Sequence, residues 1–421
     1  MSSRHGDAPI RCSFCGSTAQ ESASMVAGPD VFICDRCIHE ATQIVEGERS
    51  GAGERPRSVS APSPMVPHEI KAALDEYVIG QHPAKRALSV AVYNHYKRVE
   101  GEPYVHEYDD VELEKSNILL IGPTGTGKTL LARTLAHVLD VPFSISDATA
   151  LTEAGYVGED VESILSNLLR SCDFDVRDAE QAIIYIDEVD KVARKAQNAS
   201  ITRDVSGEGV QQALLKLLEG TEAGVPPKGG RKHPEQNLVT VDTSNILFIC
   251  GGAFGGLGDI VARRLSSSSL GFFSDDDVRD RVDADDPRIL QQAEPDDLLA
   301  YGLIPELVGR LPVITALDAL SDAEMKRILT EPKNALVKQY QKLLAMDGID
   351  LTFEDAALEA VVERARALGT GARGLRSIME DVMLDVMFNV HSHASIGTCH
   401  ITEATVRSEA PPLYQERKAS A

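Results

Sequence analysis

Tryptophan is absent from the 421 residues, and Phe, Tyr and Trp together make up only 5% of the chain. A protein that holds single-stranded nucleic acid by stacking needs a platform of aromatic side chains. Basic residues are also scarce, because 42 Lys and Arg stand against 65 Asp and Glu, for a formal net charge of −23. An unspecific grip on phosphate backbones needs clustered Lys and Arg. Both shortages argue against a nucleic-acid partner.

Long apolar runs are missing as well. No stretch approaches the roughly 18–20 apolar residues of a membrane-spanning helix, and the start, MSSRHGD, lacks the apolar core of a signal peptide. Of the seven cysteines, Cys172, Cys250 and Cys399 lie far apart, as expected of reduced thiols. We therefore expect a cytoplasmic protein without a membrane partner.

Composition predicts four segments. Residues 47–67 are rich in Gly, Ser and Pro and bury too little apolar surface to offset the entropy of ordering, which is typical of a flexible linker. It separates a small module from a longer globular body. We predict an N-terminal module at 1–47, a linker at 48–67, a large α/β domain at 68–315, and a mainly helical domain with a tail at 316–421.

The large body alternates strand-like and helical patterns, which favours an α/β fold. The runs at 117–121, 182–186 and 245–249 are continuously apolar, as in parallel strands that are buried on both faces. Beyond residue 316 the strand signal largely stops. Ser321 and Glu324 have the spacing of a capping box that opens a helix, and helical periodicity covers 353–368 and about 375–390.

Four cysteines form two CxxC pairs near the N-terminus. Each CxxC turn offers two thiolates, and this spacing is typical of a four-thiolate zinc site. The alternatives, two disulfides or free thiols, are disfavoured by a cytoplasmic location. His39 is a rival ligand, but four cysteines already complete a structural site for one zinc ion per chain. The predicted ligands are Cys12, Cys15, Cys34 and Cys37.

The small size of this module means that the metal would supply much of its stability. Zinc modules also occur in DNA-binding proteins, but Arg36 is the only basic residue between the first and last of the four cysteines. One cation is too few for a phosphate footprint. We therefore expect the module to bind protein or to dimerise.

Residues 122–129 read GPTGTGKT and fit the phosphate-loop pattern GxxxxGK[ST] between a predicted strand and a predicted helix at 129–139. The backbone N–H groups of such a loop surround phosphates, and the helix N-terminus adds positive potential. Lys128 would reach the β- and γ-phosphates, and the Thr129 hydroxyl would bind Mg²⁺. The predicted ATP-binding residues here are Gly122, Pro123, Thr124, Gly125, Thr126, Gly127, Lys128, Thr129 and the adjoining Leu130.

A second nucleotide element follows the apolar run at 182–186, which ends in Asp187 and Glu188. Two adjacent carboxylates after a buried strand are costly unless a cation lies nearby. Asp187 would hold Mg²⁺ through water, and Glu188 would polarise the attacking water. The alternative is an ordinary strand end with acidic residues. The pair predicts an ATP hydrolase rather than a mere nucleotide binder.

The chain resembles the ATP-binding unfoldases of the Clp protease, a family of the AAA+ superfamily, along nearly its whole length. The resemblance implies an AAA+ P-loop NTPase domain with a parallel sheet, a C-terminal mainly helical small domain and an N-terminal zinc-binding domain. The longest matching segments are DEYVIGQ at 75–81, LTEAGYVG at 151–158, SGEGVQQALL at 206–215, LIPELVGRLP at 303–312 and GARGLR at 371–376.

This resemblance also implies roles that the residues alone do not establish. Val78 and Ile79 match the adenine pocket of the family. Arg310 matches the arginine finger that reaches the γ-phosphate of a neighbouring subunit, and Arg373 matches a sensor from the same chain. A finger that acts on a neighbour implies a closed ring, which is a homo-hexamer in this family. Without the resemblance, either arginine would be interpreted as a surface ion-pair partner.

Four loops complete the implied machinery. Tyr156 and Val157 match a pore loop that grips the substrate polypeptide, and the segment from about 194 to 206 matches a second one. Arg231, Lys232 and His233 match a basic loop that selects tagged substrates at the ring entrance. Leu270, Gly271 and Phe272 match the loop that docks on the ClpP peptidase, although the family has Ile where this chain has Leu270. Leu keeps a similar apolar volume, so docking is still expected.

The implied function is ATP-dependent unfolding of tagged proteins and their translocation into ClpP, with adaptor proteins as further partners of the zinc module. The chain has no GxSxG nucleophile elbow of its own. The related HslU unfoldases carry a large insertion between the two nucleotide motifs, and the short interval between Lys128 and Asp187 disfavours them. A zinc-containing AAA+ ATPase that remodels nucleic acid is disfavoured by the charge. A remodelling chaperone that works without a peptidase would not need residues 270–272.

Overall fold

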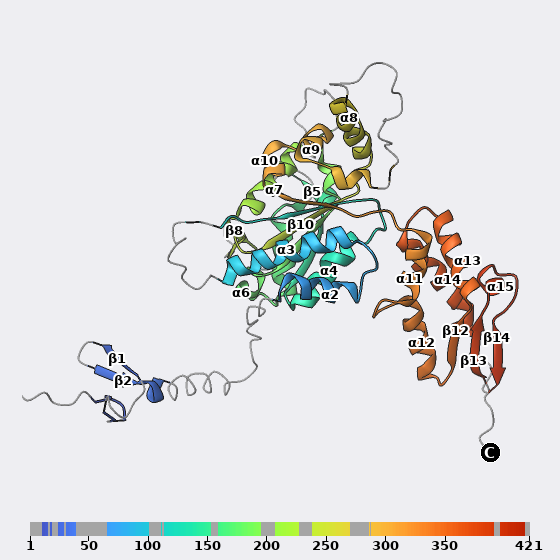
Figure 1. Cartoon of the computed structure of the whole chain (residues 1–421), viewed down its shortest axis with the longest axis horizontal. Coiled ribbons are helices and arrows are strands. Elements are labelled where there is room, and N and C mark those ends of the chain that lie inside the picture. Colours follow the sequence, from blue (N-terminus) through green and yellow to red (C-terminus); the bar gives the residue numbers. More distant parts are fainter. Residues whose placement is uncertain are drawn as a thin grey trace, which may run out of the picture. The chain divides into compact units, whose positions relative to one another are not determined.

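The computed structural model of the chain describes residues 11–15, 17–18, 24–28, 31–38, 65–100, 111, 113–152, 159–194, 207–226, 238–269, 286, 288–390 and 396–416. The chain forms two compact units, Met1–Ser58 and Val59–Ala421 (Figure 1). Most of the linker predicted at 48–67 lies outside the described residues. In the parts of the chain that are described, no helix combines the length and the apolar character needed to cross a membrane.

The N-terminal unit contains an antiparallel hairpin of β1 (Met25–Gly28) and β2 (Val31–Cys34), with Met25 opposite Cys34. An isolated bridge between Arg11 and Thr18 closes the chain around the first CxxC pair. The buried side chains described in this unit are three cysteines, against which Met25 and Ile33 pack. Such a core is too small to hold a fold by apolar burial alone.

The second unit is built on a five-stranded sheet in which all neighbouring strands are parallel. The strand order is β11-β3-β10-β7-β4, so the chain crosses from strand to strand over the sheet faces. This confirms the predicted α/β fold. The strands are β3 (Ile118–Ile121), β4 (Phe143–Asp147), β7 (Ile183–Asp187), β10 (Leu247–Gly252) and β11 (Val313–Ala316).

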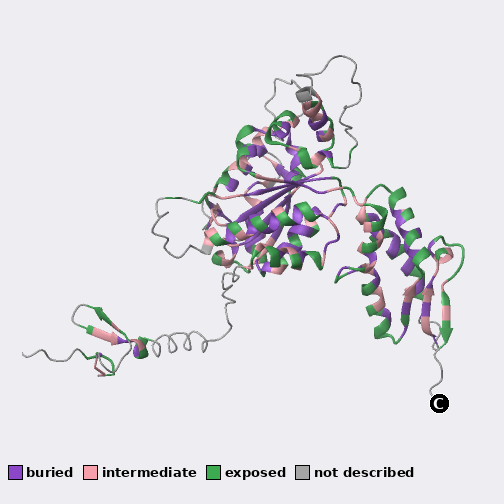
Figure 2. Ribbon diagram, viewed as in Figure 1, coloured by how far each residue is buried: buried purple, intermediate pink, exposed green. Residues whose placement is uncertain are grey.

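The two faces of this sheet contribute to different cores, which explains the continuously apolar strands. Alternate side chains of a strand point to opposite faces. Ile118, Leu120 and Tyr185 pack with α2 (Pro67–Asp75), α3 (His82–Glu100) and α4 (Lys128–Leu139). Leu119 and Phe248 belong to the core on the other face. Figure 2 shows the strands at the centre of this sheet as buried. The helices on that side are α5 (Ser163–Ser171), α6 (Val176–Ala179), α7 (Glu208–Glu219), α8 (Leu257–Ser269), α9 (Pro295–Tyr301) and α10 (Pro305–Gly309).

Short elements connect these layers. The 3₁₀ turns are η1 (Ala148–Ala150), η2 (Val189–Val192) and η3 (Ile289–Gln292). Two small pairs of strands are β5 (Leu151–Thr152) with β6 (Glu159–Asp160), and β8 (Glu222–Val225) with β9 (Val239–Asp242). Of these, η2 follows the acid pair directly and leads toward α7.

The C-terminal part has its own core and is mainly helical, as predicted. Ser321 caps α11 and forms the predicted capping box with Glu324. The sequence analysis missed a three-stranded sheet here, with order β12-β13-β14. The elements are α11 (Asp322–Thr330), α12 (Leu336–Met346), β12 (Asp350–Phe353), α13 (Asp355–Ala367), α14 (Ala372–Val390), β13 (Ile396–Ile401), α15 (Glu403–Val406) and β14 (Leu413–Glu416).

Several hydrogen bonds join the α/β part to the C-terminal part within this unit. The Gln81 side chain donates to the Asp318 carbonyl at 2.9 Å and accepts from the Asp318 N–H at 3.0 Å. The Lys333 N–H donates to the Glu76 carbonyl at 2.9 Å. These contacts lie beside Val78 and Ile79, so the segment around residue 80 connects the two parts at the predicted nucleotide site.

Candidate functional site

The four cysteines of the N-terminal unit converge on one point. Their sulfur atoms all lie within 4.8 Å of one another, and the Cys15 and Cys34 sulfurs are 3.6 Å apart. A disulfide would bring two sulfurs to about 2.05 Å, so the predicted alternative of two disulfides does not describe this cluster. At a Zn–S distance of about 2.3 Å, tetrahedral sulfurs are separated by about 3.8 Å. The cluster therefore fits zinc.

Hydrogen bonds prepare one of these thiols for a metal. The backbone N–H of Cys15, with smaller contributions from those of Cys34 and Phe14, lowers the pKa of Cys12 to about 6, although burial opposes the shift. Zinc binds the thiolate form. Cys12, Cys34 and Cys37 are buried and Cys15 is exposed. Because Cys12 is largely a thiolate near neutral pH, little free energy is needed to deprotonate it when the metal binds.

The phosphate loop depends on glycines at positions that other residues would not tolerate. Gly125 and Gly127 have φ angles of 83° and 101°, which are in the left-handed region that favours glycine. A Cβ atom on Gly122 would lie 2.6 Å from the Leu317 carbonyl oxygen. Gly127 then caps α4, so the loop leads directly into a helix N-terminus. This is the strand–loop–helix geometry in which N–H groups turn toward phosphates.

Lys128 is the first residue of α4, and its side chain folds back over the loop. Its ammonium donates to the Gly122 carbonyl at 2.5 Å and to the Pro123 carbonyl at 3.0 Å. Burial lowers the pKa of Lys128, and the negative charges of Asp187 and Asp190 partly oppose that shift. Among the residues that the structure describes, carbonyl oxygens alone bond to this buried ammonium, so it lacks a close anion there. It is therefore well suited to a phosphate ligand.

The acid pair lies next to the phosphate loop, because β3 and β7 are parallel strands of one sheet and their carboxyl ends meet at the same edge. The Thr129 hydroxyl donates to an Asp187 carboxylate oxygen at 3.2 Å. Two ligand oxygens of a Mg²⁺ ion are about 3 Å apart, because Mg–O distances are about 2.1 Å and the geometry is octahedral. These two oxygens therefore lie close enough together to serve one magnesium ion, which Thr129 would bind directly and Asp187 through water. Glu188 follows in the left-handed region with φ 58°.

One residue that the sequence analysis missed, Tyr185, holds Asp187, and a second, Gly251, makes room for it. The Tyr185 hydroxyl donates to the second carboxylate oxygen of Asp187 at 3.2 Å, and burial raises the pKa of this buried tyrosine. Gly251 leaves room for it, because a Cβ there would lie 2.0 Å from the Tyr185 oxygen. The pair of glycines that ends β10 was the signal for such a close approach. Tyr185 thus orients the carboxylate toward Thr129.

A turn from the C-terminal part covers the phosphate loop. The Ala372 N–H donates to the Gly125 carbonyl at 3.2 Å, and a Cβ on Gly125 would lie 2.3 Å from the Thr370 carbonyl oxygen. Arg373 follows this turn, and its charge contributes to the lowered pKa of Lys128. The sensor role of Arg373 stays a prediction.

Three matches to known families cover most of the chain. Residues 10–47 match the family described as the ClpX C4-type zinc finger. Residues 113–314 match an AAA domain (Cdc48 subfamily), and residues 320–400 match the C-terminal, D2-small domain of ClpB protein. The zinc finger coincides with the four-cysteine cluster. The chain belongs to the ClpX family of AAA+ proteins. Its AAA domain implies an ATPase, and its C4 finger supports zinc binding.

Val78 and Ile79, the predicted adenine-pocket residues of this ClpX-family chain, are buried and line a cavity of about 250 Å³. Arg327 and Pro332 of the C-terminal part line its other side. Leu130, which was predicted next to the phosphate loop, lies in the first turn of α4 and is half exposed. Apolar side chains at such a cavity suit a flat base.

Arg310 of the ClpX-family chain ends α10 with a half-exposed side chain. Its Nε atom donates to a Glu219 carboxylate oxygen at 3.1 Å, and its backbone carbonyl accepts from Asn117 at 3.0 Å. The structure therefore brings Lys128, Thr129 and Asp187 together and places Arg310 beside α7. The finger role stays a prediction.

The predicted loops of this ClpX-family chain lie outside the described residues, except for Arg194 at the start of the second pore loop predicted at about 194–206. These predictions concern Tyr156 and Val157 in the pore loop, Arg231, Lys232 and His233 at the ring entrance, and Leu270, Gly271 and Phe272 at the peptidase contact.

Proposed function

We propose that the chain is an ATP-dependent unfoldase and translocase that acts as a ring of six and passes tagged proteins to the ClpP peptidase. One observation carries the proposal: the phosphate loop, the acid pair and the turn at 370–372 meet at one site. Membership of the ClpX family supports the same function. A site built from both parts of the chain is suited to convert hydrolysis into movement of one part against the other.

The proposed hydrolysis divides the work among a few side chains. Lys128 and the loop N–H groups would bind the phosphates, and Thr129 and Asp187 would hold Mg²⁺, which supplies charge neutralisation when it is bound. Glu188 would accept hydrogen bonds from the attacking water and raise its nucleophilicity. Arg310 would reach the site of the next subunit, where a guanidinium stabilises the charge on the transferring phosphoryl group.

The N-terminal unit is proposed to bind protein partners, such as adaptors or tagged substrates. Phe14, Val26 and Val31 are 75%, 56% and 50% exposed. Exposed apolar side chains on so small a unit are typical of a protein-binding surface. Structural zinc would keep these side chains in place without taking part in hydrolysis.

Replacing Tyr156 by Ala tests the proposed pore loop. We expect most of the ATPase activity to persist, because Tyr156 is not part of the nucleotide site, whereas the unfolding of a stable tagged fluorescent protein should fall at least tenfold. The loss of fluorescence with ATP measures unfolding. Tyr156→Phe, which keeps the aromatic bulk, is the matched control and should retain most of the activity. Unfolding by the Ala variant at the normal rate would exclude the pore role.

Changing both Leu270 and Phe272 to Ser tests the proposed peptidase contact. Removing two apolar side chains should weaken docking into an apolar cleft, since each contributes about 2–3 kcal/mol when it is fully buried. We expect unfolding to continue while ClpP-dependent degradation of the tagged protein falls at least tenfold. The release of labelled peptides measures degradation. Degradation that stays at the normal level would show that these residues do not dock the peptidase.

A further inference from the structure

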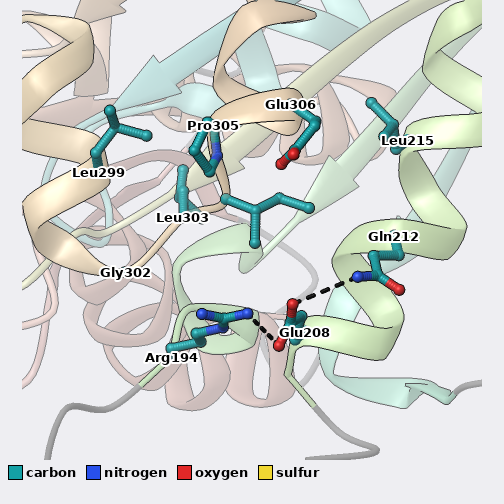
Figure 3. Close-up of a pocket in the computed structure, with 10 residues that line it drawn as sticks. Arg194, Glu208, Gln212, Leu215, Leu299, Gly302, Leu303, Pro305 and Glu306 are labelled. Atoms are coloured by element: carbon teal, nitrogen blue, oxygen red, sulfur yellow. Dashed lines mark hydrogen bonds and ion pairs between the residues drawn. The ribbon is translucent and has the colours of Figure 1, made fainter.

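Three segments of the α/β part meet at the start of α10. The first segment follows the acid pair and runs through η2 to Arg194. The second is the beginning of α7, and the third is the segment at 299–306. Residues of all three line a cavity of about 590 Å³ (Figure 3). Figure 3 shows Arg194 and Glu208 pointing toward each other, with Leu299 and Pro305 across the cavity. The junction thus joins the acid pair to the helix that carries Arg310.

One buried amide ties these segments together. Gln211 of α7 is 0% exposed. Its Nε2 atom donates to the Val192 carbonyl at 2.8 Å and, less closely, to the Gly302 carbonyl at 3.4 Å. Its Oε1 atom accepts from the Ile304 N–H at 2.8 Å. A single side chain therefore bonds to η2 on one side and to the residue that caps α10 on the other.

The backbones at this junction approach so closely that little movement is available. The Arg194 N–H donates to the Gly302 carbonyl at 3.0 Å. Gly302 has a φ angle of 121°, and a Cβ there would lie 2.4 Å from the Arg194 carbonyl oxygen. Without the Gln211 amide, the Val192 carbonyl and the Ile304 N–H would lose these hydrogen bonds, and an unsatisfied buried polar group is costly. The Gln211 side chain thus satisfies both the Val192 carbonyl and the Ile304 N–H.

A second buried amide holds the other end of α10. Asn117 is 1% exposed, and its Nδ2 atom donates to the Arg310 carbonyl at 3.0 Å and to the Leu218 carbonyl at 3.1 Å. Between these two amides α10 has only five residues. A helix rises 1.5 Å per residue, so a shift at Ile304 is carried over a short rigid span to Arg310.

We propose that Gln211 is a positioning residue for ATP hydrolysis, which fixes α10, and with it Arg310, to the segment that follows the acid pair. The inference rests on the proposed function, because it takes Arg310 as a finger that acts on the neighbouring subunit. In this arrangement a change at the acid pair of one subunit moves the arginine that serves the next.

Replacing Gln211 by Met tests the proposal, since Met keeps the volume and removes both hydrogen-bonding groups. We expect kcat for ATP hydrolysis to fall about 10- to 100-fold, the effect of a catalytic group displaced by about 1 Å. The affinity for an ATP analogue should change less than twofold, because the phosphate loop is untouched. The matched control is Gln212→Met, since Gln212 is the exposed neighbour on the same helix and its side chain donates to Glu208 at 3.4 Å. A normal kcat in Gln211→Met would overturn the proposal.

Mixed rings separate positioning of Arg310 from a general structural role. Chains with Gln211→Met keep their acid pair, and chains with Glu188→Gln keep a well-placed Arg310. When the two are mixed, a Gln211→Met site beside a Glu188→Gln neighbour receives a correct finger, so hydrolysis per Gln211→Met chain should rise at least threefold. If it does not rise, Gln211 acts within its own site or only on stability, and the inference is wrong.

A reference mixture distinguishes failure of the inference from failure of the proposed function. Arg310→Ala chains mixed with Glu188→Gln chains should recover hydrolysis if Arg310 acts on a neighbour. If they do not recover, the finger role itself is wrong and the inference falls with it. If the mixture with Arg310→Ala recovers and the mixture with Gln211→Met does not, the role of Gln211 is wrong and the finger role of Arg310 stands. If Gln211→Met fails to bind the ATP analogue, Gln211→Glu replaces it in the same mixtures, because it keeps the acceptor for Ile304 and loses the donor to Val192.

Discussion

Replacing Glu188 by Gln is expected to lower the rate of ATP hydrolysis at least 100-fold while leaving ATP binding intact. A general base contributes about 10²- to 10⁴-fold to a rate, and an amide cannot accept the proton of the attacking water. The side chain keeps its shape, and the contacts of Lys128, Thr129 and Asp187 do not involve the Glu188 carboxylate. Phosphate release measures turnover, and the binding of a fluorescent ATP analogue measures affinity.

The control for this experiment is Glu222→Gln, which neutralises an exposed acid on β8 and should hydrolyse ATP at the normal rate. Turnover by Glu188→Gln at more than a tenth of the normal rate would refute the role of Glu188. A loss of analogue binding would show that the carboxylate supports the phosphate loop rather than the water. Asp187→Asn should differ from both Glu188→Gln and Glu222→Gln. It loses the negative charge beside the Thr129 hydroxyl and should therefore bind Mg²⁺ less tightly.

Removing zinc from the full chain is expected to unfold the N-terminal unit and to leave the second unit folded. Structural zinc contributes an apparent free energy of about 10–16 kcal/mol to such modules. The described core of this unit consists of three cysteines with Met25 and Ile33, so little else could replace the metal. Limited proteolysis after treatment with a chelator should cleave within residues 11–38, while the ATPase part resists.

Cys34→Ser should have the same effect as the chelator, because it removes a buried ligand from the cluster. Cys172→Ser is the matched control, since Cys172 lies at the end of α5 outside the cluster. We expect one zinc per chain in the control and less than a fifth of that in Cys34→Ser, as measured by metal analysis. Full zinc content in Cys34→Ser would contradict the four-thiolate site, and protection from cleavage in the chelator would contradict the dependence of the fold on metal.

The nucleotide site was largely predictable because its signals are local or follow from strand polarity. The glycines of the phosphate loop are adjacent in the sequence. Asp187 could be placed beside Thr129 because the carboxyl ends of parallel strands meet at one edge of the sheet. The support from Tyr185 was not predicted, since a buried tyrosine after two isoleucines has the pattern of any core strand and the glycine pair of β10 does not say which residue it admits. Only its closeness to Gly251, a residue on another strand, gives it a role.

The case of Gln211 and Gln212 shows what periodicity could have added. Gln211 lies in the buried stripe with Leu214 and Leu218, at helical spacing, whereas Gln212 lies outside it. A polar residue in such a stripe indicates a buried hydrogen bond, but the sequence does not say which backbone groups it meets. The three strands of the C-terminal part were missed for another reason. β13 reads IGTCHI, in which partly exposed positions interrupt the buried ones, and it lacks the continuous apolar run of the central strands.

The contact between Gly125 and the turn at 370–372 has a mechanical consequence. Since the turn lies against the loop that binds the phosphates, the position of the C-terminal part and the occupancy of the nucleotide site belong to one equilibrium. Linkage is reciprocal for binding free energies. Separating the C-terminal part from Gly125 must therefore change the free energy of nucleotide binding. The change equals the one that nucleotide binding makes in the free energy of that separation. A polypeptide that resists being pulled would in this way set the timing of nucleotide exchange.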